Sequence, residues 1–289
     1  MDPAGQPDPI KGLAVLSTGS VKIRPEHGRR TRRPLPVWLL SSREWTAPLP
    51  INVYVIRHER GLVLFDTGQD RRSVTDPTYY PGGLAGVVYH RLAEFAIEPD
   101  QSLPVLLAAQ GLAAEDVTTA IVSHLHQDHL GGVLDLPNAQ LLVTKTEWEA
   151  AQQRGAEANG FLKEHILAAS PRWRQYAFGP SDDLDLAPFT SCYDVFGDGS
   201  LTLLPTPGHT PGSASLLIRR PRAPAILLVD DLTFDAPNFG ADHLPGIGSL
   251  ASLRLSTMLV KSLGRRHPGM AICATHDPAA AALFLAAAG

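Results

Sequence analysis

The stretch VTTAIVSHLHQDHLGG, residues 117–132, constrains the fold more than any other part of the sequence. An apolar run of strand composition leads directly into a loop with three histidines and an aspartate within six positions. Imidazole is the commonest metal ligand among side chains, and a loop has no packing reason to collect three of them. Histidines two positions apart share a face of an extended segment. The pattern predicts a metal site at a strand end, with the ligands His124, His126, Asp128 and His129.

Further strand ends carry residue types that bind metals. His209 follows an apolar run in PTPGHTPGS, Asp230 and Asp231 end ILLVDD, and His276 ends AICATH. Open α/β sheets place their sites at strand ends in this way. A lone aspartate there is often only a helix N-cap, so the argument depends on the whole set. Five histidines and two carboxylates are enough for two metals and too many for one four-coordinate ion.

The ligand set combines nitrogen and oxygen donors without cysteine, which favours zinc, with iron, manganese and cobalt as alternatives. Two such cations can hold a hydroxide between them and polarise a carbonyl or phosphoryl oxygen. The arrangement therefore favours hydrolysis. Cys192 and Cys273 lie far apart in sequence and predict neither a disulfide framework nor a cysteine-based zinc motif.

Short apolar runs bounded by glycine and proline predict strands, among them 13–23 and 51–58. Helical spacing predicts a helix in SLPVLLAAQGL that ends at Gly111, a second in SLASLRLSTMLVKSL, and a last one that begins with Asp277 as N-cap. Strands come first in pairs and later alternate with helices. We therefore expect one layered α/β or α+β domain over residues 1–289.

Charge and hydropathy limit the classes of partner. The chain of 289 residues has a formal net charge of -4, which argues against nucleic acid or an anionic membrane surface. It has no apolar run of about 18 residues that would predict a membrane span. The first residues lack the basic and apolar regions of a signal peptide. We expect a cytoplasmic enzyme that acts on a small molecule.

The histidine-rich motif and its ordered partners resemble the metallo-β-lactamase superfamily, whose signature is a His-x-His-x-Asp-His loop followed by distant His, Asp and His ligands. The resemblance extends from LFDTG at 64–68 to THD at 275–277. It implies a four-layer αββα sandwich, in which two mixed β-sheets lie face to face with helices outside. This fold hosts many hydrolases, so the motif specifies the fold and the metals better than the substrate.

The resemblance also implies a role for each residue of the motif. Apart from one aspartate that bridges the metals, the implied ligands form two sets. One metal would be held by His124, His126 and His209, and the other by Asp128, His129 and His276. Asp231 would bridge the metals, because the family usually has Gly-Asp there and Asp230 takes the place of the glycine. A register shifted by one residue would make Asp230 the ligand instead. Asp66 in FDTG would orient ligands rather than bind metal.

Within the superfamily, the sequence resembles N-acyl-homoserine lactone lactonases, the quorum-quenching enzymes, through SHLHQDHLGG, TPGHTPGSASLLI, DLTFD and the terminal THD. The resemblance implies that a metal-bridging hydroxide attacks the lactone carbonyl and that Asp128 carries a proton to the leaving alkoxide. These lactonases commonly have a substrate-contacting tyrosine three residues after the bridging aspartate, where this chain has Phe234. A phenyl ring donates no hydrogen bond, so another group supplies it or the substrate differs.

The segment 75–95 is the expected lid or pocket wall, because it combines glycine and proline with several tyrosines. The substrate-binding candidates are therefore Phe234, Tyr79, Tyr80 and Tyr89. Packing of these tyrosines onto the core is the equal alternative.

Rival functions remain open at this stage. On the same fold they are a thioester hydrolase of the glyoxalase II type and a phosphodiesterase or arylsulfatase, although no glutathione- or RNA-binding element is recognisable. A flavodiiron reductase would need an attached flavin domain, and an intact ligand set argues against a non-catalytic metal-binding module. Family members are often dimers, so we keep a homodimer as an expectation.

Overall fold

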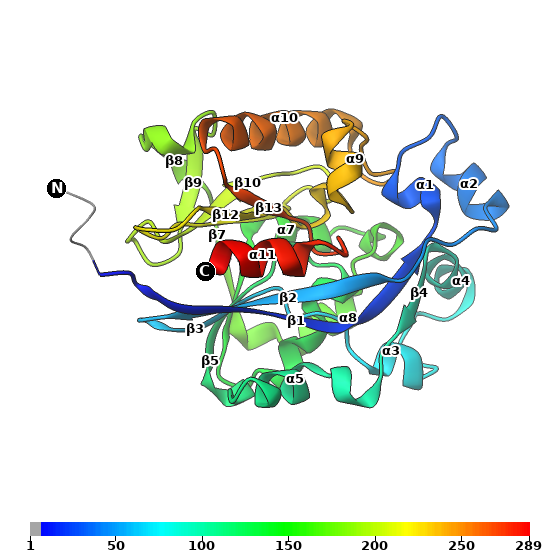
Figure 1. The fold of residues 1–289 in the computed structure, drawn as a ribbon. Coiled ribbons are helices and arrows are strands. Elements are labelled where there is room, and N and C mark those ends of the chain that lie inside the picture. The colour runs from blue at the N-terminus through cyan, green and yellow to red at the C-terminus, as the bar shows by residue number, and fades with distance from the viewer. Residues whose placement is uncertain (1–6) are drawn as a thin grey trace.

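The computed structural model describes residues 7–289, which form two β-sheets packed face to face (Figure 1). The strands of the first sheet are β1 (Ile10–Ile23), β2 (Leu49–His58), β3 (Gly61–Phe65), β4 (Ala93–Ala96), β5 (Val117–Ile121), β6 (Gln140–Thr144) and β7 (Trp173–Tyr176). Those of the second are β8 (Gly179–Pro180), β9 (Ser191–Asp194), β10 (Leu201–Pro205), β11 (Ala214–Ile218), β12 (Ile226–Leu228) and β13 (Ala271–Cys273).

Both sheets are mixed. Their strand orders are β4-β1-β2-β3-β5-β6-β7 and β13-β12-β11-β10-β9-β8. In the first sheet β1, β2 and β3 are antiparallel neighbours, whereas β3, β5, β6 and β7 run parallel. In the second sheet the β12–β13 pair is parallel and β10, β11 and β12 are antiparallel. Parallel neighbours bring their carboxyl ends to one edge, where the predicted ligands follow β5, β12 and β13.

Helices cover the outer faces. Their bounds are α1 (Pro25–Gly28), α2 (Leu35–Ser41), α3 (Arg72–Thr75), α4 (Gly83–Leu92), α5 (Leu103–Ala109), α6 (Gln127–Leu130), α7 (Lys145–Ala151), α8 (Lys163–Ala168), α9 (Ala236–Gly240), α10 (Leu250–Arg266) and α11 (Ala280–Ala288). Short 3-10 turns lie between them, among them η8 (Asp230–Leu232). Helices α5, α7 and α8 pack on the first sheet, α10 packs on the second, and α11 lies against β1 and β13. The four-layer αββα prediction is confirmed.

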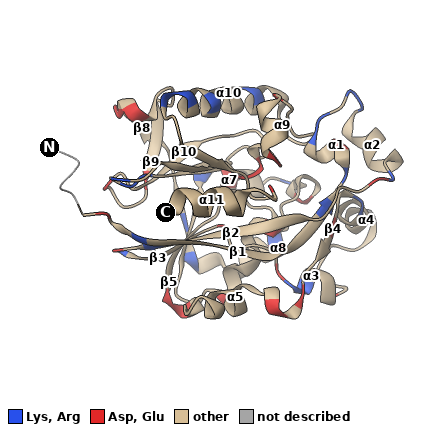
Figure 2. Cartoon of the chain, in the orientation of Figure 1, with Lys and Arg blue, Asp and Glu red and all other residues tan. Residues whose placement is uncertain are grey.

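The apolar residues explain this arrangement. Alternating residues of both sheets, such as Val63 and Leu216, meet in a core that Phe284 of α11 closes. Leu253 and Val260 of α10 lie seven positions apart on one helical face, and both are buried against the second sheet. None of the helices within residues 7–289 is long and apolar enough to cross a membrane. Lys and Arg residues are distributed over several elements, including α10 and the connection between α1 and α2 (Figure 2).

One local prediction differs from the structure. The last helix begins at Ala280 rather than directly after Asp277, because residues 278 and 279 form a turn, in which the Asp277 carboxylate accepts the backbone N–H of Ala279. The segment 75–95, the expected lid or pocket wall, is largely regular: it contains α4, and it ends in β4, which pairs with β1. Helix α4 lies beside α2 at the side of the molecule where α1 also lies (Figure 1).

Candidate metal centre

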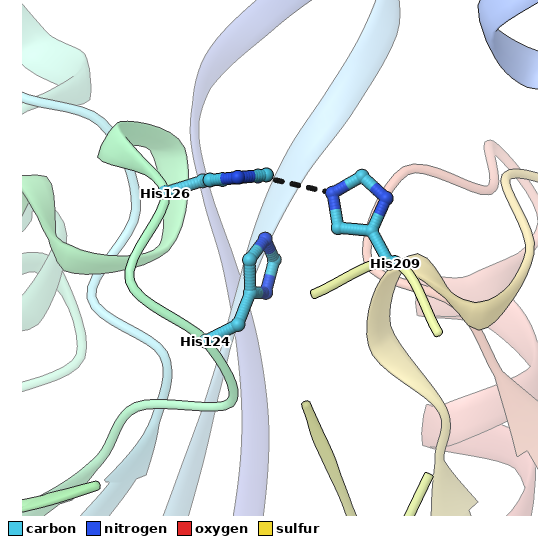
Figure 3. A group of neighbouring side chains, drawn as sticks. All are labelled: His124, His126 and His209. Carbon is cyan, nitrogen blue, oxygen red and sulfur yellow. Dashed lines mark hydrogen bonds between the residues drawn. The ribbon is translucent and has the colours of Figure 1, made fainter. Parts of the chain in front are cut away.

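Two clusters of candidate ligands lie at the common edge of the sheets. Within each cluster the ligand atoms lie within 4.8 Å of one another. The clusters are His124, His126 and His209 (Figure 3), and Asp128, His129 and His276. The loop after β5, the β10–β11 connection and the segment after β13 therefore supply the residues that the sequence predicts as ligands.

The outer nitrogen of three of these histidines is held by an acceptor. His126 Nε2 donates to the carbonyl oxygen of Asn159 (2.9 Å), and His276 Nδ1 donates to that of Pro50 (2.8 Å). His124 Nδ1 lies 2.7 Å from a carboxylate oxygen of Asp230. Because these oxygens only accept, the facing nitrogen carries the proton and the other ring nitrogen keeps its lone pair. Such outer contacts fix metal-ligating imidazoles.

The inner atoms have no protein donor to satisfy them. His124 Nε2, His129 Nε2 and Asp231 Oδ1 are buried without a hydrogen-bond partner among the described residues. His126 Nδ1 and His209 Nε2 face each other at 3.0 Å (Figure 3). Each unpaired buried polar atom costs about 1–3 kcal/mol, so native proteins rarely leave several together. Divalent cations would satisfy all of them, and this donor set fits such ions.

The side chain of Asp231 lies between the two clusters. Its Oδ2 is 3.3 Å from Nε2 of His209, in the first cluster. Its Oδ1 is 3.4 Å from Nε2 of His276 and 3.7 Å from Nε2 of His129, in the second. One carboxylate therefore faces the inner nitrogens of both clusters, which is the position that a bridging ligand requires.

Asp230 lies on the outer side of the same histidines. Its carboxylate contacts Nδ1 of His124 at 2.7 Å and Nδ1 of His129 at 3.0 Å. His124, His129 and Asp230 also lie close enough together to hold a metal ion. The histidine nitrogens in these contacts, however, donate to the carboxylate, so we assign the contacts as hydrogen bonds. The backbone of Asp230 has φ +52°, a conformation that glycine adopts easily. The glycine that the family resemblance implies at this position would adopt the same conformation without strain.

Asp66, directly after β3, supports His129 from outside. Its Oδ2 lies 3.1 Å from His129 Nδ1, and its Oδ1 accepts the backbone N–H of Ser123 at 2.8 Å. The residue is fully buried and has φ +60°. Holding a non-glycine residue in the left-handed backbone region costs of order 1–3 kcal/mol, which the surrounding contacts must offset. Asp66 therefore orients a candidate ligand and the start of the histidine loop.

The pKa values of the two adjacent aspartates are shifted in opposite directions. Burial raises the pKa of Asp231 to about 6, although neighbouring histidines, His276 first, oppose the shift. Burial also acts against the charge of Asp230, but His129 and His124 hold its pKa well below the usual range. Asp230 has its cationic or donating partners within the protein. Asp231 has too few of them, which is the situation that a bound cation corrects.

Glu147 of α7 joins the two ligand loops, a role that the sequence did not indicate. This fully buried carboxylate accepts the N–H of Leu125 at 3.0 Å and that of Gly212 at 2.9 Å. Thr144 caps the same helix turn by accepting the N–H of Glu147, and its hydroxyl donates to the Gly212 carbonyl. Leu125 lies between His124 and His126, and Gly212 lies three residues after His209. Glu147 therefore fixes the distance between the two loops.

A cavity of about 640 Å³ opens onto the candidate metal centre. At its polar end lie Asp128, His209, Asp231 and His276. Its apolar wall comes from β1, α2, α4 and β4 and includes Val21, Ile23, Leu35, Leu39, Leu92 and Phe95. An apolar wall beside convergent polar groups is typical of a site for a small amphipathic molecule.

The aromatic substrate candidates divide into two groups. Phe234 and Tyr89 line this cavity. Tyr79 and Tyr80 are not among its lining residues: the Tyr79 hydroxyl lies 3.4 Å from Gln69 Oε1, and the Tyr80 ring packs against Tyr79 and Tyr89. The role of these tyrosines as substrate contacts stays a prediction.

Sequence comparisons identify the group of proteins that shares these features. The family model for the metallo-beta-lactamase superfamily matches residues 46–228. An N-acyl homoserine lactonase, AttM of Rhizobium radiobacter, is 31% identical over 238 residues, 82% of this chain and 85% of the relative. AttM of Azorhizobium caulinodans is 30% identical over 279 residues, 96% of this chain and 97% of the relative.

Solved structures share the architecture. A mutant of the B. thuringiensis AiiA protein with N-decanoyl-L-homoserine at its active site superposes with a TM-score of 0.73 at 24% identity, covering 93% of this chain and 94% of that one. An N-acyl homoserine lactone hydrolase with N-hexanoyl-L-homoserine at its metal center gives 0.74 at 24% identity, with the same coverage. The family match over residues 46–228 agrees with the two facing sheets and with the ligand clusters at their edge. The chain therefore belongs to the metallo-β-lactamase superfamily.

Proposed function

We propose that this protein hydrolyses the lactone ring of N-acyl-homoserine lactones, using two divalent cations with zinc as the first choice. The observation that carries the proposal is the juxtaposition of two ligand clusters, with Asp231 between them, and a cavity that has an apolar wall. The curated lactonase relatives, about 30% identical along most of the chain, support the same activity.

The reaction adds water across the acyl–oxygen bond of the ring. When bound, the two cations supply a nucleophilic hydroxide and Lewis-acid stabilisation of the carbonyl oxygen. His124, His126 and His209 would hold one cation, and Asp128, His129 and His276 the other. Asp128 lies at the cavity end of its cluster, with Oδ2 3.5 Å from His276 Nε2. In the proposal it carries a proton to the ring oxygen, which leaves as the hydroxyl group of the N-acyl-homoserine product.

The cavity would orient the substrate through its two unlike ends. The polar lactone lies toward the histidines, and the acyl chain lies along the wall formed by β1, α2, α4 and β4. Burying one methylene contributes about 0.8 kcal/mol, so longer chains gain affinity until the cavity of about 640 Å³ is filled. In this proposal residues 1–289 act as a single domain in a cytoplasmic, quorum-quenching enzyme, and a homodimer is compatible with it.

Turnover of a substrate panel tests the proposed function. Purified protein loaded with zinc, iron, manganese or cobalt is assayed with N-hexanoyl- and N-decanoyl-homoserine lactone, a glutathione thioester and a phosphodiester. We expect kcat/KM to be highest for the lactones and higher for the decanoyl than for the hexanoyl chain. Preferential hydrolysis of the thioester or the phosphodiester with every metal would contradict the lactonase assignment.

Metal content tests the two-cation centre separately. Elemental analysis of protein reconstituted with zinc and dialysed is expected to give two ions per chain, because two clusters and a bridging carboxylate are present. Removal of both ions by a chelator should lower the melting temperature, since bound ligands stabilise the folded state. A stoichiometry near one after reconstitution would contradict the dinuclear centre.

A further inference from the structure

His27, in the short helix α1, lies in the wall of the cavity beside the candidate metal centre. Its ring lies edge-on to that of Phe234, with centroids 5.2 Å apart, and parallel to that of His209 at 6.3 Å. Helix α1 follows β1 directly, so the end of a core strand fixes the position of the residue. His27 is not a member of either ligand cluster.

Both ring nitrogens of His27 lack a hydrogen-bond partner among the described residues, although both are buried. The other histidine nitrogens in this condition belong to His124, His129 and His209, which face or adjoin the candidate metal centre. A histidine ring carries at least one N–H donor in either protonation state, so His27 offers a hydrogen-bond donor. A buried ring without partners calls for an explanation, and a ligand in the cavity is one.

The other aromatic side chains near this wall do not provide a free donor. Phe234 has no polar atom, and it packs with Val21, Ile23 and Ile51. The Tyr89 hydroxyl already donates to the carbonyl oxygen of Glu157 at 2.7 Å. Outside the two ligand clusters, His27 is therefore the aromatic residue lining the cavity that has an uncommitted N–H group among the described residues.

We propose that His27 is a substrate-contacting residue whose N–H group donates a hydrogen bond to the lactone carbonyl oxygen; this inference rests on the proposed lactonase function. The lactone carbonyl oxygen is the substrate atom that gains negative charge during attack, so a fixed donor stabilises the transition state more than the ground state. The second torsion of a histidine side chain is broad, so the ring edge can turn into the cavity without a backbone change.

Replacement of His27 in the metal-loaded protein tests the contact. His27→Phe keeps a planar ring and removes the donor, whereas His27→Asn keeps an N–H donor on a shorter side chain. We expect His27→Phe to lower kcat on N-hexanoyl-homoserine lactone by about 10- to 100-fold, with little change in KM. His27→Asn should recover part of this loss, and both variants should retain two zinc ions per chain. His267→Phe is the matched control, because His267 lies after the far end of α10 and donates to the Asp185 carbonyl.

A double variant gives an independent measurement. Phe234→Tyr adds one hydroxyl beside the position of the His27 ring. If the hydroxyl can take over as donor, Phe234→Tyr should raise kcat in the His27→Phe background and change it much less in the wild type. Because the two rings are in contact, some coupling is expected in any case, but a gain in kcat on adding the hydroxyl only where the His27 donor is missing indicates that both groups serve one substrate atom.

The outcomes separate this inference from the proposed function. Wild-type kcat retained in His27→Phe, with lactone turnover intact, overturns the role of His27 and leaves the lactonase function standing. Loss of zinc in His27→Phe and His27→Asn also overturns it, because the residue would then support the metal centre rather than the substrate. Wild-type protein that contains two zinc ions and opens no lactone overturns both.

Discussion

Replacing Asp231 with asparagine is expected to remove metal and activity together. The Asp231 carboxylate faces inner nitrogens of both ligand clusters at 3.3–3.7 Å and has few partners within the protein. A neutral amide is a poor bridge between two cations, and its NH₂ group would point at an ion or at a lone pair. We expect a loss of more than about 100-fold in metal affinity, beyond what outer contacts typically contribute. Isothermal titration with zinc and lactone turnover measure the two effects.

Asp230→Asn is the matched control, because the same change is made one residue earlier. This carboxylate accepts hydrogen bonds from Nδ1 of both His124 and His129. The amide can accept only one of them, so the ligands lose orientation while the inner nitrogens remain. We expect a loss of about 10- to 100-fold in metal affinity and a protein that still binds two ions at high zinc. The reverse ranking of the two variants would show that Asp230 is the bridging ligand.

The candidate ligands could be predicted from the sequence because each lies in a short pattern at a strand end. His124, His126 and His209 occur beside apolar runs and glycines, and these neighbouring residues indicate strand ends and turns. The choice between Asp230 and Asp231 was harder, since adjacent residues share every local signal. The contacts favour Asp231 as the proposed bridge, because the Asp230 carboxylate lies at the outer nitrogens of His124 and His129 whereas that of Asp231 faces inner nitrogens.

Strand and helix periodicity predicted a layered α/β chain but did not give the four layers, which came from the family resemblance. The long amphipathic helix α10 was predictable because its apolar face repeats over 17 residues. The start of α11 was not, because a turn at residues 278 and 279 precedes it and the Asp277 carboxylate also accepts the N–H of Ala236, a contact 41 positions away in sequence.

Residues that act through distant contacts gave no sequence signal. Glu147 occurs in a polar helix, KTEWEAAQQR, where a glutamate is ordinary on a solvated face. Its two partners lie 22 and 65 positions away. His27 stands alone in a basic segment, and only the folding of α1 against the cavity gives it a candidate role.

Replacing Glu147 with glutamine is expected to destabilise the protein even though the side chain keeps its shape. Both carboxylate oxygens accept backbone N–H groups, from Leu125 and Gly212, in a fully buried position. A glutamine has one oxygen, so its NH₂ group must face one of these N–H groups and leave it unpaired. A hydrogen bond to a charged group contributes about 1.5–3 kcal/mol, and an unpaired buried donor costs a further 1–3 kcal/mol. The neutral amide avoids the cost of burying a charge, which offsets part of this loss, so we expect the free energy of unfolding to fall by about 2–4 kcal/mol.

Urea unfolding of the metal-free and zinc-loaded forms measures this change. Glu149→Gln is the control, because Glu149 lies on the same helix and only forms an exposed ion pair with Lys145 at 3.8 Å. Such exposed pairs contribute about 0–1 kcal/mol. Because Glu147 ties the His124–His126 loop to the His209 loop, Glu147→Gln should also weaken zinc binding, whereas Glu149→Gln should not. Equal stability and equal zinc affinity in the two variants would mean that the ligand loops keep their spacing without this carboxylate.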